Sequence, residues 1–222
     1  MFVYSLDGLK MTGGAAMDVE IEDNEHTARS GVYNVLAGFF TLPDPEAHAA
    51  AVAGGWPAQL REAGEMLAFE FDFGAAALAN SVEGSAFETE YVRLFGGPGT
   101  PAASIFAGDY GEGERMDRIA ELTRQFEYYG LAASDDKARS PDHLATECEF
   151  MQYLAFKEAA SSSKRLAGSY HRAQEGFIER HLASWLPAFS EKVEQAQGLP
   201  IYVWVSQTAV RFVEADLAYL RS

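Results

Sequence analysis

Residues 140–159 read SPDHLATECEFMQYLAFKEA, and this stretch decides the fold class. Serine is a common helix N-cap, and proline is accepted at the first helical position. An acidic residue in the first turn is favoured by the helix dipole. The sequence therefore predicts a helix over 141–159, with Ser140 as its N-cap, Pro141 as its first residue and Asp142 in its first turn.

Apolar residues recur at helical spacing through most of the chain, between glycines and prolines. We expect further helices over 28–40, 46–52, 57–71, 87–95, 116–126, 169–186 and 200–219, the one from 169 being interrupted by Pro187 and resuming to Ala196. Residues 201–205 are β-branched and aromatic, yet a helical stripe continues to Tyr219, so we interpret this segment as helix. The predicted fold class is all-α, a single helical-bundle domain over 27–222 with no sheet of three or more strands. A flexible acidic segment over 1–26 is expected to precede it.

One connection is long and rich in glycine. Residues 96–112 read GGPGTPAASIFAGDYGE, and seven of these seventeen residues are glycine or proline. A loop of this length in a compact domain is usually functional or mobile. We expect it to be more mobile than the helices, or ordered by a neighbour or ligand, because it offers few large apolar anchors. As a hinge it would permit exchange of helices between chains, giving a dimer beside a monomer.

Composition excludes several classes of protein. A chain of 222 residues with 48% hydrophobic residues has ample material for one core, so general disorder is excluded. The single cysteine, Cys148, excludes an internal disulfide and fits a reducing compartment. No apolar stretch approaches the roughly 20 residues of a membrane span, and residues 1–17 lack the pattern of a secretory signal, so we expect a cytoplasmic protein. The net charge of −16 disfavours nucleic acid and favours a basic partner, although solubility alone also explains it.

His143 and Glu147 are four residues apart and share one helix face, which Phe150 continues. Three interpretations remain open. A metal site needs a third ligand, which His171 or His181 could supply, and no HExxH pattern is present. Acid–base catalysis needs a partnered nucleophile or a pocket. The plainest interpretation is a histidine satisfied by a carboxylate near a helix start. We predict no bound metal and no cofactor.

Three segments carry a resemblance to a known family. Residues 88–95, ETEYVRLF, with the following GGPG, look like an acidic-aromatic-x-Arg-Leu-Phe helix end and its glycine-proline turn. Residues 140–151 look like a Pro-Asp-His motif that leads into Glu-x-Glu-Phe-Met, and residues 177–187, FIERHLASWLP, look like a helix with His-Leu-x-x-Trp. In this order the segments resemble the TorD/DmsD/NarJ family of redox-enzyme maturation chaperones, over about residues 28–220. Residues 102–106, AASIF, depart from the family's Pro/Trp/Tyr-rich stretch.

The resemblance implies an all-helical chaperone, not an enzyme, for a molybdenum enzyme of the dimethyl-sulfoxide-reductase superfamily. Such chaperones bind the twin-arginine signal of the catalytic subunit, or a similar remnant N-terminus, and delay export until the molybdopterin cofactor is inserted. The motifs suggest a relative of the accessory subunits for the ethylbenzene, dimethylsulfide and selenate enzymes. The expected partner is the catalytic subunit of a molybdenum oxidoreductase.

The resemblance also implies a set of site residues. Those expected to bind the signal peptide are Asp142, His143, Glu147, Phe150, Glu90, Tyr91, Arg93 and Phe95, and those expected to be structural are Pro141, Gly97, Pro98, His181 and Trp185. A twin-arginine signal is a basic pair followed by an apolar stretch, so its binder needs carboxylates beside an apolar groove. Asp142 and Glu147 beside Phe150 would supply both, although Asp142 could serve only to cap its helix.

Two other functions remain possible at this point. One is a helical metal- or nucleotide-dependent enzyme that uses His143, Glu147 and His181, which bound metal or turnover without a partner would favour. The other is an assembly subunit that stays in the mature enzyme, which its absence from the purified active enzyme would exclude.

Overall fold

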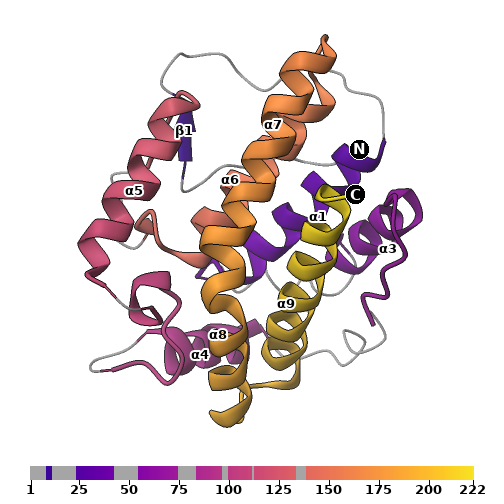
Figure 1. The fold of residues 1–222 in the computed structure, drawn as a ribbon. Coiled ribbons are helices and arrows are strands. Elements are labelled where there is room, and N and C mark those ends of the chain that lie inside the picture. The colour runs from indigo at the N-terminus through magenta and orange to yellow at the C-terminus, as the bar shows by residue number, and fades with distance from the viewer. Residues whose placement is uncertain are drawn as a thin grey trace.

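Two helices form the centre of the molecule (Figure 1). The structure, a computed structural model, describes residues 9–11, 24–42, 55–74, 84–96, 100–111, 113–133 and 139–222. Helices α1 (Glu25–Phe39) and α6 (Leu144–Ala159) pack against each other and are buried along nearly their whole length. A helix buried on all sides has no polar face, which is why the apolar residues of α6 do not form a narrow stripe.

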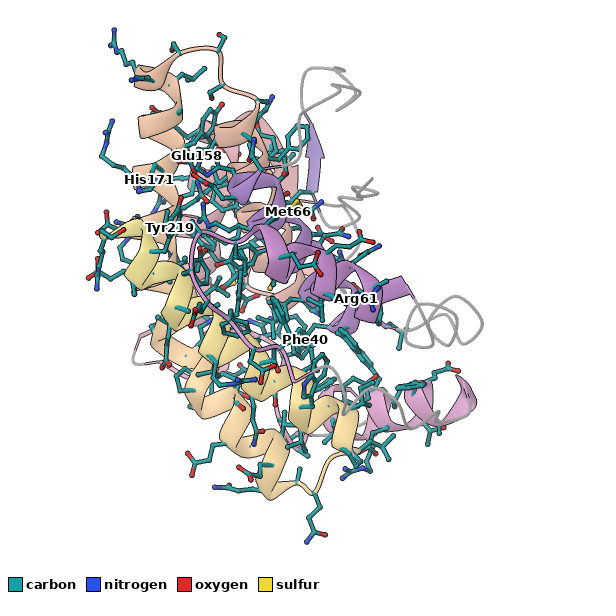
Figure 2. The ribbon with its side chains drawn as sticks, turned by 90° about the vertical axis from the view of Figure 1, so that its right-hand side faces the viewer. Phe40, Arg61, Met66, Glu158, His171 and Tyr219 are labelled. Carbon is teal, nitrogen blue, oxygen red and sulfur yellow. The ribbon has the colours of Figure 1, made fainter. Side chains whose placement is uncertain are left out.

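The other helices cover this central pair. Helix α3 (Trp56–Met66) packs on α1, and α7 (Lys164–Phe177) packs on α6. Helices α8 (Ala183–Gln195) and α9 (Pro200–Leu220) pack on each other, and α4 (Gly84–Phe95) adds its apolar face to the core. Figure 2 shows Phe40 within this core, where its ring lies 5.5 Å from that of Phe189. Aromatic rings supply much of the buried apolar surface.

Helix α5 (Arg115–Tyr128) lies along one side of the molecule (Figure 1). It is held by the short helix η3 (Ala107–Asp109) at one end and by strand β2 (Leu131–Ala133) at the other. Strand β2 pairs antiparallel with β1 (Leu9–Met11), and this ladder is the only sheet among the described residues. The prediction of an all-α fold is confirmed. None of the described helices is both long and apolar enough to cross a bilayer.

The helix predicted over 169–186 continues past Pro187. Helix α7 continues through a π-turn, η5 (Ile178–Leu182), into α8, and Pro187 lies inside α8. The predicted interruption at Pro187 is therefore wrong. A proline inside a helix forfeits one backbone hydrogen bond, and here the burial of the neighbouring Trp185, Leu186 and Phe189 offsets that loss. The predicted helix over 201–205 is confirmed as the start of α9.

Of the predicted flexible segment, only residues 9–11 and 24–26 are described. The first are β1, and the second begin α1, where the Asn24 side chain accepts hydrogen bonds from the backbone N–H groups of His26 (2.9 Å) and Thr27 (3.2 Å). The predicted helix over 46–52 lies outside the described residues.

Candidate functional site

Helix α6 begins at Leu144 and not at Pro141. Its N-cap is His143, whose Nδ1 accepts a hydrogen bond from the backbone N–H of Ala145 (3.1 Å). Ser140 lies in a turn before the helix, and its backbone carbonyl accepts a hydrogen bond from the His143 N–H (2.9 Å). The predictions of Ser140 as N-cap and of Asp142 in the first turn are therefore wrong.

The glycine-rich loop causes this later start. In its described part, 100–111, Phe106 forms an antiparallel bridge with His143, and Ile105 accepts a hydrogen bond from the Leu144 N–H (3.0 Å). This pairing holds the residue before Leu144 in extended backbone, so the helix cannot start earlier.

The loop is also anchored by large apolar side chains. Ile105 is buried, and the ring of Tyr110 lies 5.2 Å from that of Trp185. The prediction that few such anchors are present is wrong for residues 100–111. The greater mobility of the loop stays a prediction, and Gly97 and Pro98 lie outside the described residues.

Asp142 lies at the junction of loop and helix and already holds an arginine. Its two carboxylate oxygens accept hydrogen bonds from Nε (2.8 Å) and Nη2 (3.2 Å) of Arg115, the first residue of α5. The Gly108 N–H (3.3 Å) and the Ser140 hydroxyl (2.6 Å) also donate to it. The guanidinium of Arg115 lies 4.3 Å from the centre of the Phe106 ring. Asp142 is fully buried, whereas the side chain of Arg115 is 37% exposed.

His143 and Glu147 take different partners. Burial, with Arg139 and Arg115 nearby, lowers the pKa of His143 to about 3, so the imidazole is neutral at pH 7. Glu147 is fully buried, and the indole N–H of Trp185 donates to its Oε2 (3.1 Å). Burial raises the pKa of Glu147 to about 8, against the lowering effect of Arg118 and of the indole bond. These two groups therefore form part of the wall of the site, not an exposed acid–base pair.

Phe150 lines the larger of two pockets along α5. This pocket, about 390 Å³, is lined also by Glu121, Arg124, Gln125, Tyr128, Tyr129, Ala173 and Arg180. The second pocket, about 190 Å³, is more polar and is lined by Gly108, Gly111, Gly113, Glu114, Arg115, Arg118, Glu121, Arg180 and His181. Because Glu121 and Arg180 line both, the two pockets adjoin and form a groove between α5 and the α7–η5 segment. We call this the α5 groove.

His181 lies in the π-turn at the polar pocket. Its Nε2 lies 3.1 Å from the side-chain nitrogen of Gln125, which we assign as the donor. Burial, with Arg118 and Arg180 nearby, lowers the pKa of His181 to about 4. π-Turns are frequent at functional sites, and this one brings His181 and Arg180 to the groove. His181 and Trp185 are both buried, and their structural roles stay a prediction.

The Glu90–Phe95 segment lies at another part of the fold. Glu90 accepts hydrogen bonds from Arg93 (2.6 Å) and from the backbone N–H of Leu199 (2.8 Å). The Tyr91 hydroxyl donates to the Phe40 carbonyl (3.0 Å), and Phe95 is buried. These side chains tie the end of α4 to the α8–α9 turn and the core. The loop that leads to the Asp142 junction departs from this end of α4.

The sequence did not identify four residues of the site. These are Arg115, Phe106, and the Glu121 and Arg180 that line both pockets. Arg115 is far from Asp142 along the chain, and no local spacing pairs them. Phe106 was noted only as part of the departure from the family pattern. The missing information is tertiary, since it depends on how α5 lies beside the loop.

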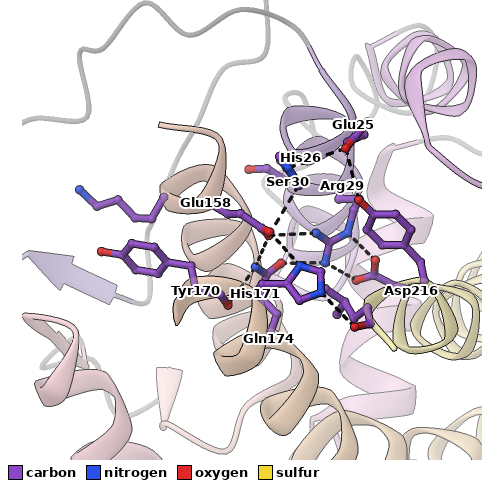
Figure 3. Close-up of polar contacts among 12 residues, drawn as sticks. Glu25, His26, Arg29, Ser30, Glu158, Tyr170, His171, Gln174 and Asp216 are labelled. Atoms are coloured by element: carbon purple, nitrogen blue, oxygen red, sulfur yellow. Dashed lines mark hydrogen bonds and ion pairs between the residues drawn. The ribbon is translucent and has the colours of Figure 1, made fainter. Parts of the chain in front are cut away.

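A second polar cluster is buried at the other end of α6 (Figure 3). Arg29 donates to Asp216 (3.1 Å from Nη2 to Oδ2) and to Gln174 (2.7 Å), and Glu158 accepts from Gln174 (2.7 Å) and lies 2.8 Å from Nδ1 of His171. These groups satisfy one another, as buried polar groups must. The cluster is structural, and among the described residues there is no group of three His, Cys, Asp or Glu placed to hold a metal.

Comparison with known proteins places this geometry in a family. The family model for the nitrate reductase delta subunit matches residues 53–191, more than half of the chain. The chain belongs to this family. It is 34% identical to the selenate reductase assembly chaperone protein of Thauera selenatis, over 78% of this chain and 79% of that protein. It is 31% identical to the perchlorate reductase assembly chaperone protein of Dechloromonas aromatica, over 86% of this chain and 88% of that protein.

The fold agrees with this assignment. The structure matches the crystal structure of a protein from Archaeoglobus fulgidus proposed to mature redox enzymes, with a TM-score of 0.50 and 15% identity, over 93% of this chain and 100% of that chain. At this identity the likeness concerns the fold alone. Family and relatives confirm the resemblance drawn from the three segments. They also make the chain an assembly chaperone and not an enzyme.

Proposed function

We propose that this chain is a cytoplasmic assembly chaperone for the catalytic subunit of a molybdenum oxidoreductase. It binds the N-terminal twin-arginine signal region of that subunit and delays its export until the molybdopterin cofactor is inserted. The relatives named for selenate and perchlorate reductase assembly support this class of client.

The observation that carries the proposed binding site is the α5 groove, which has aromatic side chains beside Tyr128 and becomes more polar towards Arg115. Tyr128 and Tyr129 offer aromatic surface on which the apolar stretch of a signal packs, over the buried ring of Phe150. Glu114 and Glu121 offer carboxylates at the polar pocket, where an arginine forms charge-assisted bonds. Arg115, Arg118 and Arg180 line the same pocket, so a client arginine has to compete with them for these carboxylates. The net charge of −16 speeds the encounter with a basic segment.

The residues expected from the family motifs have different roles in this proposal. Phe150 is buried and supports the aromatic wall of the groove, and Asp142 and His143 border the basic part of the peptide. Glu147 supports the wall through Trp185, because its carboxyl group is buried. Glu90, Tyr91, Arg93 and Phe95 hold the end of α4 from which the loop departs.

The first experiment identifies the client. Affinity-tagged chain is recovered from cytoplasm, and mass spectrometry names the proteins that co-purify. The proposal expects the catalytic subunit of a molybdenum oxidoreductase, before its cofactor is inserted. Recovery of the chain as a stoichiometric part of the mature, active enzyme would instead make it a permanent subunit.

The second experiment tests the groove by calorimetric titration with the N-terminal peptide of that client. Tyr128→Ala and Glu121→Lys alter two groove residues that are exposed or half-exposed, so the fold should survive. Each should weaken binding about tenfold, the effect of losing roughly 1.4 kcal/mol. Val92→Ala changes an exposed apolar residue on α4 and serves as the matched control. Wild-type affinity in both groove variants would move the binding site elsewhere.

A further inference from the structure

We propose that Asp142 and Phe106 form a receptor site for an arginine side chain of the client, and that Arg115 of the chaperone itself fills this site in the free protein. The inference rests on the proposed function. It adds that binding proceeds by exchange, in which an incoming arginine displaces Arg115.

The site has the chemistry that recognises a guanidinium group. Both oxygens of Asp142 accept from Arg115, one from Nε and one from Nη2, which is a two-point carboxylate contact. The Phe106 ring lies 4.3 Å from the guanidinium carbon. A cation over an aromatic face adds an attraction that the flat guanidinium uses better than an ammonium group does.

The receptor is held in place by groups other than Arg115. The Gly108 N–H and the Ser140 hydroxyl donate to the Asp142 carboxylate, and the Ala107 N–H donates to the Asp142 backbone carbonyl (2.8 Å). Phe106 is fixed by its bridge to His143. A site fixed in this way does not collapse when its occupant leaves, so it can receive a second guanidinium without rebuilding.

The side chain of Arg115, in contrast, is free to move away from Asp142. Its side chain is 37% exposed and lines the polar pocket of the α5 groove, so the receptor opens into the groove once Arg115 moves. It is the first residue of α5, where the N-cap residue Glu114 makes no side-chain capping bond. Its Nη1 is already 4.0 Å from the half-exposed carboxylate of Asp109, which can take the guanidinium after release.

An ordinary structural ion pair and an exchangeable occupant predict opposite effects on binding. With an internal occupant, the apparent affinity equals the intrinsic affinity of the open site multiplied by the fraction of molecules whose site is open. Removing Arg115 should therefore tighten the binding of an arginine peptide, although it leaves Asp142 unpaired and lowers stability. If the pair is only structural and the peptide arginine binds elsewhere, removal of Arg115 weakens the fold and does not improve binding.

The test measures binding of a fluorescent peptide with two adjacent arginines followed by an apolar stretch. Its matched probes carry two lysines or two glutamines in place of the arginines. The proteins are wild type, Arg115→Ala, Asp142→Asn and the double variant, each titrated well below its melting temperature. We expect Arg115→Ala to bind the arginine peptide roughly tenfold more tightly than wild type, with little gain for the lysine or glutamine probes. Asp142→Asn should abolish this gain in the double variant.

A second measurement follows Arg115 directly in the wild-type protein. The Nε–Hε resonance of Arg115 should shift to that of an exposed arginine when the peptide binds, while an Nε–Hε resonance of the peptide moves to the bound position. An unchanged Arg115 resonance with saturated peptide, or weaker binding by a folded Arg115→Ala, would overturn the exchange and leave the chaperone function standing. Failure of every protein to bind any of the probes or the client's own N-terminal peptide removes both proposals.

Discussion

His143 acts first as the cap of α6, because its Nδ1 accepts the Ala145 N–H (3.1 Å). Asparagine offers an acceptor at the same position, whereas leucine does not. We expect His143→Leu to cost about 1 kcal/mol or more of the free energy of unfolding at pH 7, and His143→Asn to cost much less. Urea denaturation measures both. Equal losses in the two variants would show that the cap bond contributes nothing.

The same residue makes stability depend on pH. The pKa of His143 is lowered from 6.5 to about 3 on folding. The unfolded chain therefore takes up a proton below pH 6.5 that the folded chain refuses, and stability is lost as the pH falls from 6.5 towards 3. Relative to His143→Asn, wild type should lose about 1.4 kcal/mol per pH unit over this window. Parallel stability curves for the two proteins between pH 7 and pH 5 would contradict this prediction.

Ionisation of Glu147 is expected to lower stability as the pH rises, which is opposite to the effect of His143. Its pKa is raised from 4.5 to about 8 on folding, so the folded chain keeps a proton that the unfolded chain releases above pH 4.5. Stability present below pH 4.5 is then lost as the pH rises to about 8. Glutamine keeps an oxygen for the Trp185 indole and does not ionise. Glu147→Gln should therefore gain stability over wild type by roughly 1 kcal/mol per pH unit across this range, with Glu127→Gln on the exposed face of α5 as control. A constant difference between pH 5 and pH 8 would sink the prediction.

At the scale of elements, the sequence predicted helices well and their exact starts less well. The apolar spacing identified α1, α4, α5, α6 and α9 from local information alone. The start of α6 and the π-turn before α8 depend on tertiary contacts, namely the pairing of Phe106 with His143 and the packing of the α7–η5 segment beside α5. The Pro-Asp-His motif lies immediately before the start of α6. It could not reveal that Asp142 is already paired, because Arg115 comes from another element.

The contact between η3 and α5 depends on a glycine. A Cβ at Gly108 would lie 2.3 Å from Cγ of Arg115, so Gly108→Ala must push Arg115 away from Asp142. We expect a loss of about 1–3 kcal/mol of unfolding free energy, typical of overpacking at a tight contact. Gly111→Ala is the matched control, since its Cβ would meet only the far end of the Arg118 side chain at 3.6 Å. Comparable melting temperatures for the two variants would mean that Arg115 is not held where the structure has it.

At the scale of the whole molecule, the fold is closed by the buried cluster of Figure 3. Arg29 on α1 reaches Asp216 on α9, Gln174 on α7 and Glu158 on α6. The Tyr33 hydroxyl adds a hydrogen bond to Asp216 (2.8 Å). Burial raises the pKa of Tyr33 far above its usual range, so it stays a donor. One guanidinium thus joins α1 to α6, α7 and α9, and the α5 groove lies on the outside of the bundle that this cluster holds together.

This arrangement predicts a large and non-additive effect on stability. Arg29→Met removes the only cation that contacts Asp216 among the described residues and leaves buried carboxylates uncompensated, which typically costs about 3–5 kcal/mol. Arg29→Met combined with Asp216→Leu should cost less than the sum of the two single changes, because the second removes a charge that the first left unpaired. Arg221→Met, at an exposed pair with Glu179, is the control and should cost under about 1 kcal/mol. The free energies of unfolding of all four variants come from urea titration. If Arg29→Met is as mild as the control, or the double variant is strictly additive, the cluster does not hold the helices together, and the core aromatic packing must carry that role.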